Sequence, residues 1–179
     1  DINDMKFPQK YLISVANISE RKQTLKLAQY AKKAQVPIVF MGSKNPNDPY
    51  FKAFKKEIDN KYVFYPGYVS KQWKDCIEKH ASGYVLLSLG ESGCIAVYEA
   101  AAYKIPLLLS NLPWAWGYEN PTDIYFCDQQ DEKKAIQQLK NFYTISGKMN
   151  HTAFTIHTWE DVAKLYVEEY NKILNSANK

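Results

Sequence analysis

Short apolar runs alternate with longer amphipathic segments along the whole sequence, and this alternation limits the possible folds more than any other feature. Six runs have the length and composition of strands: 11–15, 37–41, 62–65, 83–89, 106–109 and 124–127. Six other segments have helical spacing or composition: 20–34, 50–58, 70–81, 93–103, 131–143 and 159–174. Strands that alternate with helices form βαβ units, so we predict an α/β fold in three layers around a mainly parallel sheet of about six strands.

The composition is that of one globular domain. The 179 residues are 46% apolar, 15% aromatic and 23% charged, which excludes a disordered chain. No apolar run approaches the roughly 20 residues of a membrane helix, and the first ten residues do not have the pattern of a signal peptide. The chain begins with Asp1 rather than Met, so we expect it to be part of a longer protein.

Charge and cysteine content narrow the class of partner and the compartment. The net charge of +4 is too small to indicate nucleic-acid binding, although it suits a small anionic ligand. The three cysteines are odd in number and form no CxxC pair. We therefore expect reduced thiols in a cytoplasmic protein, without a disulfide framework or a zinc site.

In a parallel sheet, ligands bind beyond the carboxyl ends of the strands, so the functional residues are expected in the loops that follow them. The most informative loop joins the fourth strand to a helix within SLGESGCIAVYEAAA, residues 88–102. Gly90, Ser92 and Gly93 allow a sharp turn whose backbone N–H groups face outward at the start of the helix. Such a turn can bind a phosphate or diphosphate without a charged side chain.

Glu91 and Glu99 flank this turn. If both lay on one helix, eight helical steps would separate them by about 12 Å and about 80°. That is too far for a glycosidase acid/base pair, whose carboxyls lie roughly 5–9.5 Å apart. The two carboxylates could instead hold opposite ends of one long ligand with an anionic centre, as in a nucleotide-sugar. Glu160 and Glu168 show the same spacing by chance.

These segments resemble the C-terminal, donor-binding domain of GT-B glycosyltransferases in the large retaining family four, the glycosyl transferases group 1. ESGCIAVYEAAAYKIP at 91–106 is similar to the family pattern E-G-F-G-x-x-x-x-E-A-x-A-x-G-x-P. SVANISERK at 14–22 resembles V-G-R/N-x-x-x-R-K, PGYVS at 66–70 resembles F-x-G-x-V-S, and TWE at 158–160 resembles the terminal S-W-E helix. The resemblance extends from Tyr11 to Leu174.

The resemblance implies a Rossmann-like three-layer sandwich that is one half of a GT-B fold. It divides the chain into a linker remnant (1–10), a nucleotide-sugar-binding domain (11–158) and a C-terminal helix (159–179). That helix would cross toward an N-terminal domain absent from this chain.

The resemblance also implies roles for particular residues. The catalytic candidates are Glu91, which would contact the hydroxyls of the donor sugar, and Lys22, which would pair with the diphosphate. Glu99 would bind the ribose hydroxyls, backbone amides from Ser92 to Ile95 the diphosphate, and the Tyr68-Val69 backbone would lie beside the base. The full set of expected substrate-binding residues is Glu99, Arg21, Asn17, Ser92, Gly93, Cys94, Ile95, Tyr68 and Val69.

The implied activity is that of a hexosyltransferase. A glycosyl group would pass from a nucleotide-diphosphate sugar (UDP, GDP or ADP, left open) to an acceptor hydroxyl with retained configuration, in polysaccharide or glycoconjugate biosynthesis. No metal or cofactor is expected, because lysine and arginine would neutralise the diphosphate. The acceptor, a sugar or glycolipid, would bind the absent N-terminal domain, so the fragment alone is expected to be inactive. Peripheral membrane association of the full-length enzyme is a further expectation.

Three positions depart from the family pattern. Asn17 stands where many members have a second diphosphate-binding arginine, so Arg21 would have to compensate. Cys94 replaces a glycine in the phosphate loop, which narrows the permitted backbone angles. Lys104 replaces the glycine that usually ends the following helix, so a different helix cap is expected. These departures affect the expected donor affinity rather than the fold.

Two alternatives remain open. One is a nucleotide-sugar-binding module without catalysis, because the retained residues indicate binding alone. The other is a serine hydrolase, since Gly90 to Gly93 imitates a nucleophile elbow with Ser92 as nucleophile. Asp123 or Asp128 and then His151 or His157 follow in the appropriate order, but the signature requires glycine at position 94.

Overall fold

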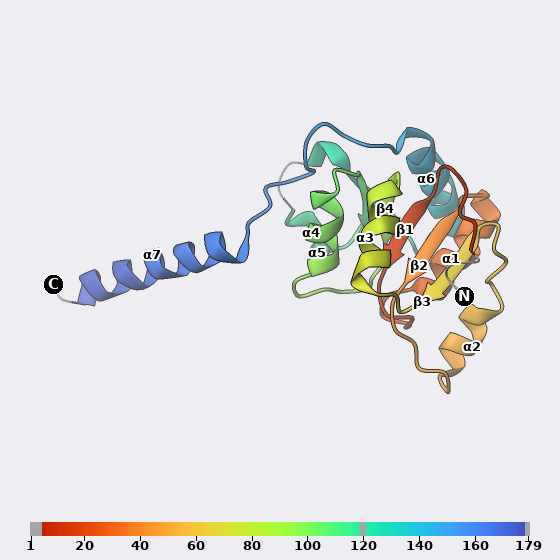
Figure 1. The fold of residues 1–179 in the computed structure, drawn as a ribbon, viewed down its shortest axis with the longest axis horizontal. Coiled ribbons are helices and arrows are strands. Elements are labelled where there is room, and N and C mark those ends of the chain that lie inside the picture. Colours follow the sequence, from red (N-terminus) through yellow and green to blue (C-terminus); the bar gives the residue numbers. More distant parts are fainter. Residues whose placement is uncertain (1–4, 119–120, 178–179) are drawn as a thin grey trace.

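A six-stranded, all-parallel sheet forms the centre of the protein, as the sequence predicted (Figure 1). The computed structural model describes residues 5–118 and 121–177. The strands lie in the order β3-β2-β1-β4-β5-β6. Their bounds are β1 Leu12–Val15, β2 Ile38–Met41, β3 Val63–Gly67, β4 Gly83–Leu86, β5 Leu107–Ser110 and β6 Ile124–Cys127.

Helices connect these strands close to the predicted positions. They are α1 Thr24–Ala34, α2 Pro49–Lys55, α3 Lys71–His80, α4 Ile95–Ala102, α5 Pro113–Trp116, α6 Glu132–Ile145 and α7 Trp159–Ala177, with a 3-10 turn at Pro121–Asp123. Helix α5 and the 3-10 turn have no counterpart in the sequence prediction, because elements of three or four residues are too short to show helical periodicity. The predicted strand 83–89 was too long, since β4 ends at Leu86.

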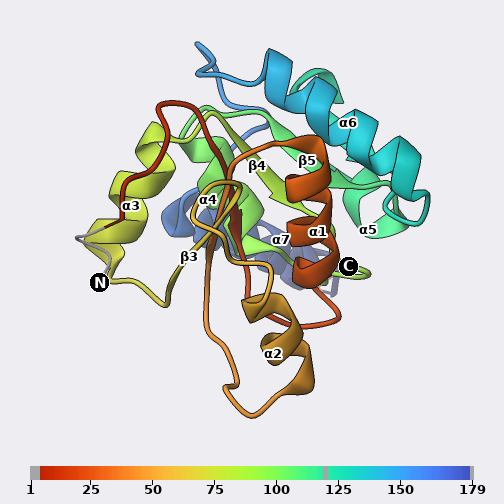
Figure 2. The same ribbon diagram turned by 90° about the vertical axis from the view of Figure 1, so that its right-hand side faces the viewer.

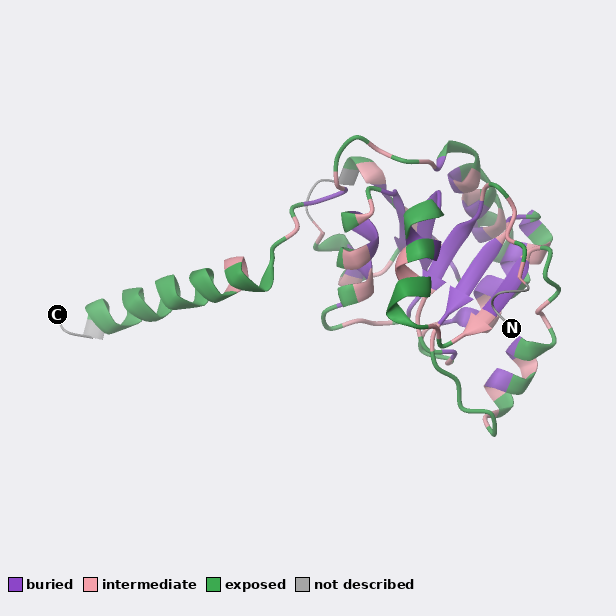
Figure 3. Cartoon of the chain, viewed as in Figure 1, coloured by how far each residue is buried: buried purple, intermediate pink, exposed green. Residues whose placement is uncertain are grey.

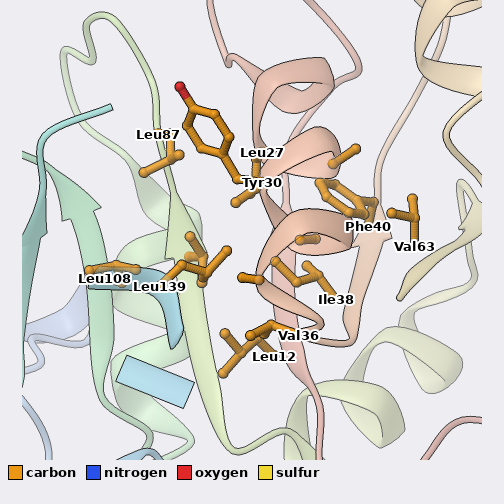
Figure 4. Packing of buried hydrophobic residues seen from close by; sticks show 14 of the residues in the cluster. Leu12, Leu27, Tyr30, Val36, Ile38, Phe40, Val63, Leu87, Leu108 and Leu139 are labelled. Atoms are coloured by element: carbon orange, nitrogen blue, oxygen red, sulfur yellow. The ribbon is translucent and has the colours of Figure 1, made fainter. Parts of the chain in front are cut away.

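Apolar side chains cover both faces of the sheet, which explains why the strands are continuous apolar runs. Helices α1, α2 and α6 pack on one face, around Leu12, Ile38 and Phe40 (Figure 4). Figure 2 shows α1 beside α6 on that face. Helices α3, α4 and α5 contribute to the second core on the opposite face, around Ile13 and Leu109. The result is a three-layer sandwich with a buried sheet (Figure 3).

The end of α4 does not use the different cap expected from the sequence. Lys104 itself adopts the left-handed conformation, with φ of 56°. Its N–H donates to the carbonyl of Ala101 at 2.9 Å. Lys104 therefore takes the backbone shape that glycine adopts more easily at this position.

Helix α7 projects away from the sandwich (Figure 1). None of its residues whose burial is described is buried. One side carries large exposed apolar residues: Trp159, Tyr166, Tyr170 and Ile173. Within the described residues, no helix has both the length and the apolar character to cross a membrane.

Candidate functional site

The chain leaves the neighbouring strands β1 and β4 in opposite directions across the sheet. These two strands are neighbours, but β1 is followed in sequence by β2 on one side and β4 by β5 on the other. The loops beyond their carboxyl ends therefore separate, which is where open parallel sheets bind ligands. The predicted site residues follow β1, β3 and β4, so the fold places them all at this edge.

Charged side chains tie the loops after β1 and β4 together. Lys22 Nζ lies 2.5 Å from Oε1 of Glu91, and Arg21 Nη1 lies 3.2 Å from Oε2 of the same carboxylate. Arg21 also donates to the carbonyl of Gly90 at 2.7 Å. Burial by itself would raise the pKa of Glu91, but hydrogen bonds, chiefly from Lys22, hold that pKa below its usual value. Glu91 is therefore an ionised carboxylate between two cations.

The first hollow at this edge is basic. It has a volume of about 480 Å³. Its lining consists of Val15, Ala16, Asn17, Arg21, Lys22, Met41, Gly42, Ser43, Tyr68, Val69 and Lys74. Three cationic side chains, Arg21, Lys22 and Lys74, thus face one space, a lining suited to an anion.

Asn17 and Gly42 both line this first hollow. The Ser43 hydroxyl donates to Oδ1 of Asn17 at 2.7 Å. A Cβ atom on Gly42 would lie 2.1 Å from the carbonyl oxygen of Ala16. Glycine is therefore required for the loop after β2 to approach the loop after β1 so closely.

A second hollow of about 470 Å³ adjoins the first between α3 and α4. The two share Tyr68, Val69 and Lys74 in their linings. Glu99 lines the second hollow, and its Oε2 lies 2.6 Å from Lys74 Nζ. Tyr68 is 85% exposed beside both spaces, so its ring is available to stack on a ligand. Glu99 and Lys22 consequently belong to adjoining hollows with different chemistry.

The backbone amides of the loop between β4 and α4, from Ser92 to Ile95, were expected to bind the diphosphate. Ser92 and Gly93 are exposed and line neither hollow. The Ile95 N–H donates to the carbonyl of Gly93 at 3.2 Å, so this amide is already paired. Buried Cys94 precedes α4 with φ of −86°, an ordinary value for cysteine. The expected conflict from replacing glycine at position 94 therefore does not arise.

Glu91 and Glu99 do not lie on one helix, so the separation by eight helical steps that was considered from their spacing does not apply. Helix α4 begins at Ile95, so only the second half of the interval is helical. Glu91 lies in the preceding loop, where Lys22 and Arg21 hold it. Contacts with the β1 loop, rather than helix geometry, determine its position.

Lys74 and Glu78 were not predicted as site residues, although both lie on α3 and line the second hollow. Their i,i+4 spacing was a weak signal, since such pairs are common on exposed helices. Here Glu78 is fully buried, which sequence spacing alone cannot reveal.

The residues required for a serine hydrolase are not brought together. His151 Nε2 lies 2.6 Å from Oδ2 of Asp123, so these two do form a pair. Within residues 5–118 and 121–177, however, Ser92 forms no hydrogen bond with a histidine. Across those same residues, no group of three or more His, Cys, Asp or Glu side chains is arranged to hold a metal ion.

The fold and the location of the hollows define the class of protein as one Rossmann-like half of a GT-B glycosyltransferase. The chain belongs to the family described as Glycosyl transferases group 1, whose sequence profile matches residues 3–153. No curated protein sequence matches it significantly.

Solved structures share this fold at low sequence identity. AviGT4, a glycosyltransferase involved in avilamycin A biosynthesis, is 16% identical with a TM-score of 0.71, covering 97% of this chain and 54% of AviGT4. The pneumococcal O-GlcNAc transferase GtfA, solved with UDP and GlcNAc, is 17% identical with a TM-score of 0.56, covering 74% of this chain and 28% of GtfA. A trehalose-6-phosphate protein from E. coli bound with UDP-2-fluoro glucose is 11% identical with a TM-score of 0.61, covering 76% of this chain and 37% of the E. coli protein. The chain thus spans about half the length of AviGT4 and less of the other two.

Proposed function

We propose that this chain is the nucleotide-sugar-binding domain of a retaining glycosyltransferase. The observation that carries the proposal is the pair of adjoining hollows at the carboxyl edge of the sheet. One is lined by three cations and the other contains the carboxylate of Glu99. A nucleoside diphosphate has the matching layout, with an anionic diphosphate beside a ribose that offers hydroxyl donors. The UDP and UDP-sugar named for the structures of GtfA and the E. coli protein support this ligand class.

In this proposal, Lys22 and Arg21 neutralise the diphosphate in the basic hollow. Both side chains are paired with Glu91 in the structure, so a diphosphate would share them with this carboxylate. Glu91 would then accept hydrogen bonds from the hydroxyls of the donor sugar. Glu99 would accept hydrogen bonds from the ribose, with Tyr68 beside the base.

These residues would act by positioning the donor and stabilising charge. As the bond from the sugar to the diphosphate breaks, negative charge grows on the leaving diphosphate. Preorganised cations lower the energy of that state, because they need no rearrangement at the moment of reaction. We propose no metal or cofactor, since Lys22 and Arg21 supply the positive charge.

The whole enzyme would be a cytoplasmic hexosyltransferase of polysaccharide or glycoconjugate biosynthesis. The acceptor, a sugar or glycolipid, would bind an N-terminal half that this chain does not include. The exposed apolar side of α7, formed by Trp159, Tyr166, Tyr170 and Ile173, would pack against that half. By itself this chain would bind the donor without transferring its sugar.

Calorimetric titration with UDP, GDP and ADP tests the proposal. We expect the Glu99→Ala variant to lose about ten- to a hundredfold in affinity, because charge-assisted hydrogen bonds contribute about 1.5–3 kcal/mol each. Lys22→Ala should weaken the diphosphates far more than the matching nucleosides, whereas Glu99→Ala should weaken both.

Glu168→Ala is the matched control, because Glu168 is an exposed glutamate on α7 outside both hollows. Its affinities should equal those of the unmodified chain. Equal affinities for all four proteins, or no binding of any nucleotide, would show that the assigned site is wrong.

A further inference from the structure

Glu78 is a buried carboxylate without a hydrogen-bond donor. Its exposed fraction is 0%, yet it belongs to the lining of the second hollow. Neither carboxylate oxygen accepts a hydrogen bond within the described part of the chain. The nearest cation is Lys74 on the preceding turn of α3, whose Nζ lies 3.7 Å from Oε2 of Glu78. Lys74 and Glu78 therefore form an ion pair, but the distance between these two atoms is too long for a hydrogen bond.

The same ammonium group already serves another carboxylate. Lys74 Nζ donates to Oε2 of Glu99 at 2.6 Å. Burial would lower the pKa of Lys74, but the hydrogen bond with Glu99 and the charge of Glu78 raise it above its ordinary value. The ammonium group of Lys74 thus contacts two carboxylates. It donates a hydrogen bond to Glu99 but none to Glu78.

We propose that Lys74 is a positioning residue that transfers its hydrogen bond from Glu99 to Glu78 when a nucleotide binds. This inference rests on the proposed function, because it requires ribose hydroxyls to bind Glu99. Those hydroxyls donate to Glu99 in place of the ammonium group. Lys74 then moves toward Glu78 and gives this buried carboxylate its missing donor. The transfer frees Glu99 for the ligand and keeps both carboxylates paired.

The transfer of this hydrogen bond should change the protonation of Glu78. Burial raises the pKa of Glu78 to about 7, so close to neutral pH about half of these carboxyls carry a proton. The groups around Glu78 are Lys74 and Asp75 on α3, Glu99 on α4, and the Tyr103 hydroxyl, which donates to Asp75 at 3.0 Å. The Tyr84 side chain on β4 also interacts with the charge of Glu78.

Among these neighbours Lys74 carries the positive charge. When its ammonium group moves closer to Glu78, it stabilises the ionised form of that carboxyl. Nucleotide binding therefore lowers the pKa of Glu78 and releases a proton to the buffer.

Isothermal titration of the chain with UDP, GDP and ADP at pH 7 measures this proton. Each titration is repeated in phosphate and Tris buffers, whose ionisation enthalpies differ. The unmodified chain should release up to about half a proton more per bound nucleotide than Glu78→Gln, because glutamine does not titrate. The phosphates of the nucleotide release the same number of protons in both proteins, so the difference isolates Glu78.

Two variants and one spectroscopic measurement complete the test. Lys74→Met should lose the same proton release, whereas Lys71→Met should retain it. Lys71 lines the same hollow but is 88% exposed and paired with Asp75. Carbon-13 NMR of the unmodified chain, labelled at glutamate carboxyls, should show one raised pKa that falls on saturation with UDP. This measurement does not depend on how any variant folds.

The outcomes separate the two proposals. If UDP, GDP or ADP binds and Glu78→Gln releases as many protons as the unmodified chain, the transfer of Lys74 is overturned while the proposed function stands. If no nucleotide binds to any of the proteins, both the proposed function and the transfer are overturned.

Discussion

Lys22 and Glu91 form an ion pair across 69 positions of sequence, with Nζ 2.5 Å from Oε1. The pair joins the loop after β1 to the loop after β4, at the point where the order of strands reverses. A backbone hydrogen bond from Leu89 to the carbonyl of Arg21, at 2.9 Å, reinforces the connection. The candidate site is therefore held together by contacts between its own residues.

This pair should contribute measurably to folding stability. The side chains of Lys22 and Glu91 are only 12% and 9% exposed. Lys22→Met and Glu91→Gln should each lower the free energy of unfolding by about 1–3 kcal/mol, because each leaves a poorly solvated charge without its partner. The double variant should lose less than the sum of the two. Urea unfolding of all four proteins measures this coupling.

The exposed pair of Lys172 and Glu169, at 2.6 Å, is the control. Its coupling should not exceed about 0.5 kcal/mol, as is usual for solvated ion pairs on helices. Equal coupling in the two pairs would contradict a special role for the contact between Lys22 and Glu91.

Gly42→Ala should destabilise the protein. The added methyl group would lie 2.1 Å from the Ala16 carbonyl oxygen, which is backbone and cannot rotate away. Steric overlap and backbone strain each cost about 1–3 kcal/mol, so we expect a loss of at least about 2 kcal/mol in thermal or urea unfolding. Gly117→Ala is the control, because no atom lies within 4 Å of its added Cβ. Similar losses for both variants would show that the close approach at Gly42 is not the cause.

Glu78 should make stability depend on pH. Burial raises its pKa to about 7 in the folded protein from an ordinary value of 4.5, so the folded state prefers the protonated form. The unmodified chain should therefore lose stability as pH rises from about 4.5 to about 7, by up to about 1.4 kcal/mol for each pH unit. Glu78→Gln should lack this loss, and its advantage should grow from pH 5 to pH 8.

Urea unfolding at pH 5 and pH 8 measures that difference, with Glu168→Gln as the exposed control. A difference between Glu78→Gln and the unmodified chain that stays constant with pH would mean that Glu78 is ionised throughout this range.

Ser92 should not react with a fluorophosphonate probe. Such probes label a serine whose hydroxyl is activated by a neighbouring base. Ser92 forms no hydrogen bond with a histidine in the described structure. Mass spectrometry after exposure to the probe should find Ser92 unlabelled, with an active serine hydrolase labelled in parallel. Stoichiometric labelling that disappears in His151→Ala or His157→Ala would favour the hydrolase alternative instead.

Lys104→Gly should raise stability. Lys104 has φ of 56°, a conformation that costs a residue with a Cβ atom about 1 kcal/mol more than glycine. The greater freedom of glycine in the unfolded chain offsets part of this gain, so we expect an increase of up to about 1 kcal/mol. Lys79→Gly, on helical α3, should have the opposite sign and lose about 0.5–1 kcal/mol. Thermal unfolding compares them, and a loss in both variants would contradict the strain at Lys104.

The sequence determined the layers of this protein and the edge that carries its site. Continuous apolar runs such as 37–41 can be satisfied only when both faces of a sheet are covered, so a parallel sheet between helices followed from the pattern. Because the strands are parallel, the loops that follow them lie at one edge of the sheet, and this edge includes Lys22 and Glu91. Short elements such as α5 escaped prediction because four residues show no period.

Only the tertiary structure decided which charged residues form ion pairs with one another. Glu91 and Glu99 were expected to contact opposite ends of one ligand, but their spacing did not reveal their partners: Glu91 pairs with Lys22 in the loop after β1, while Glu99 pairs with Lys74 on α3. Local sequence records the spacing of residues along one element. The distance between residues on different elements depends on how helices and loops pack over the sheet. The burial of Glu78, and with it the competition for Lys74, arises from the same packing.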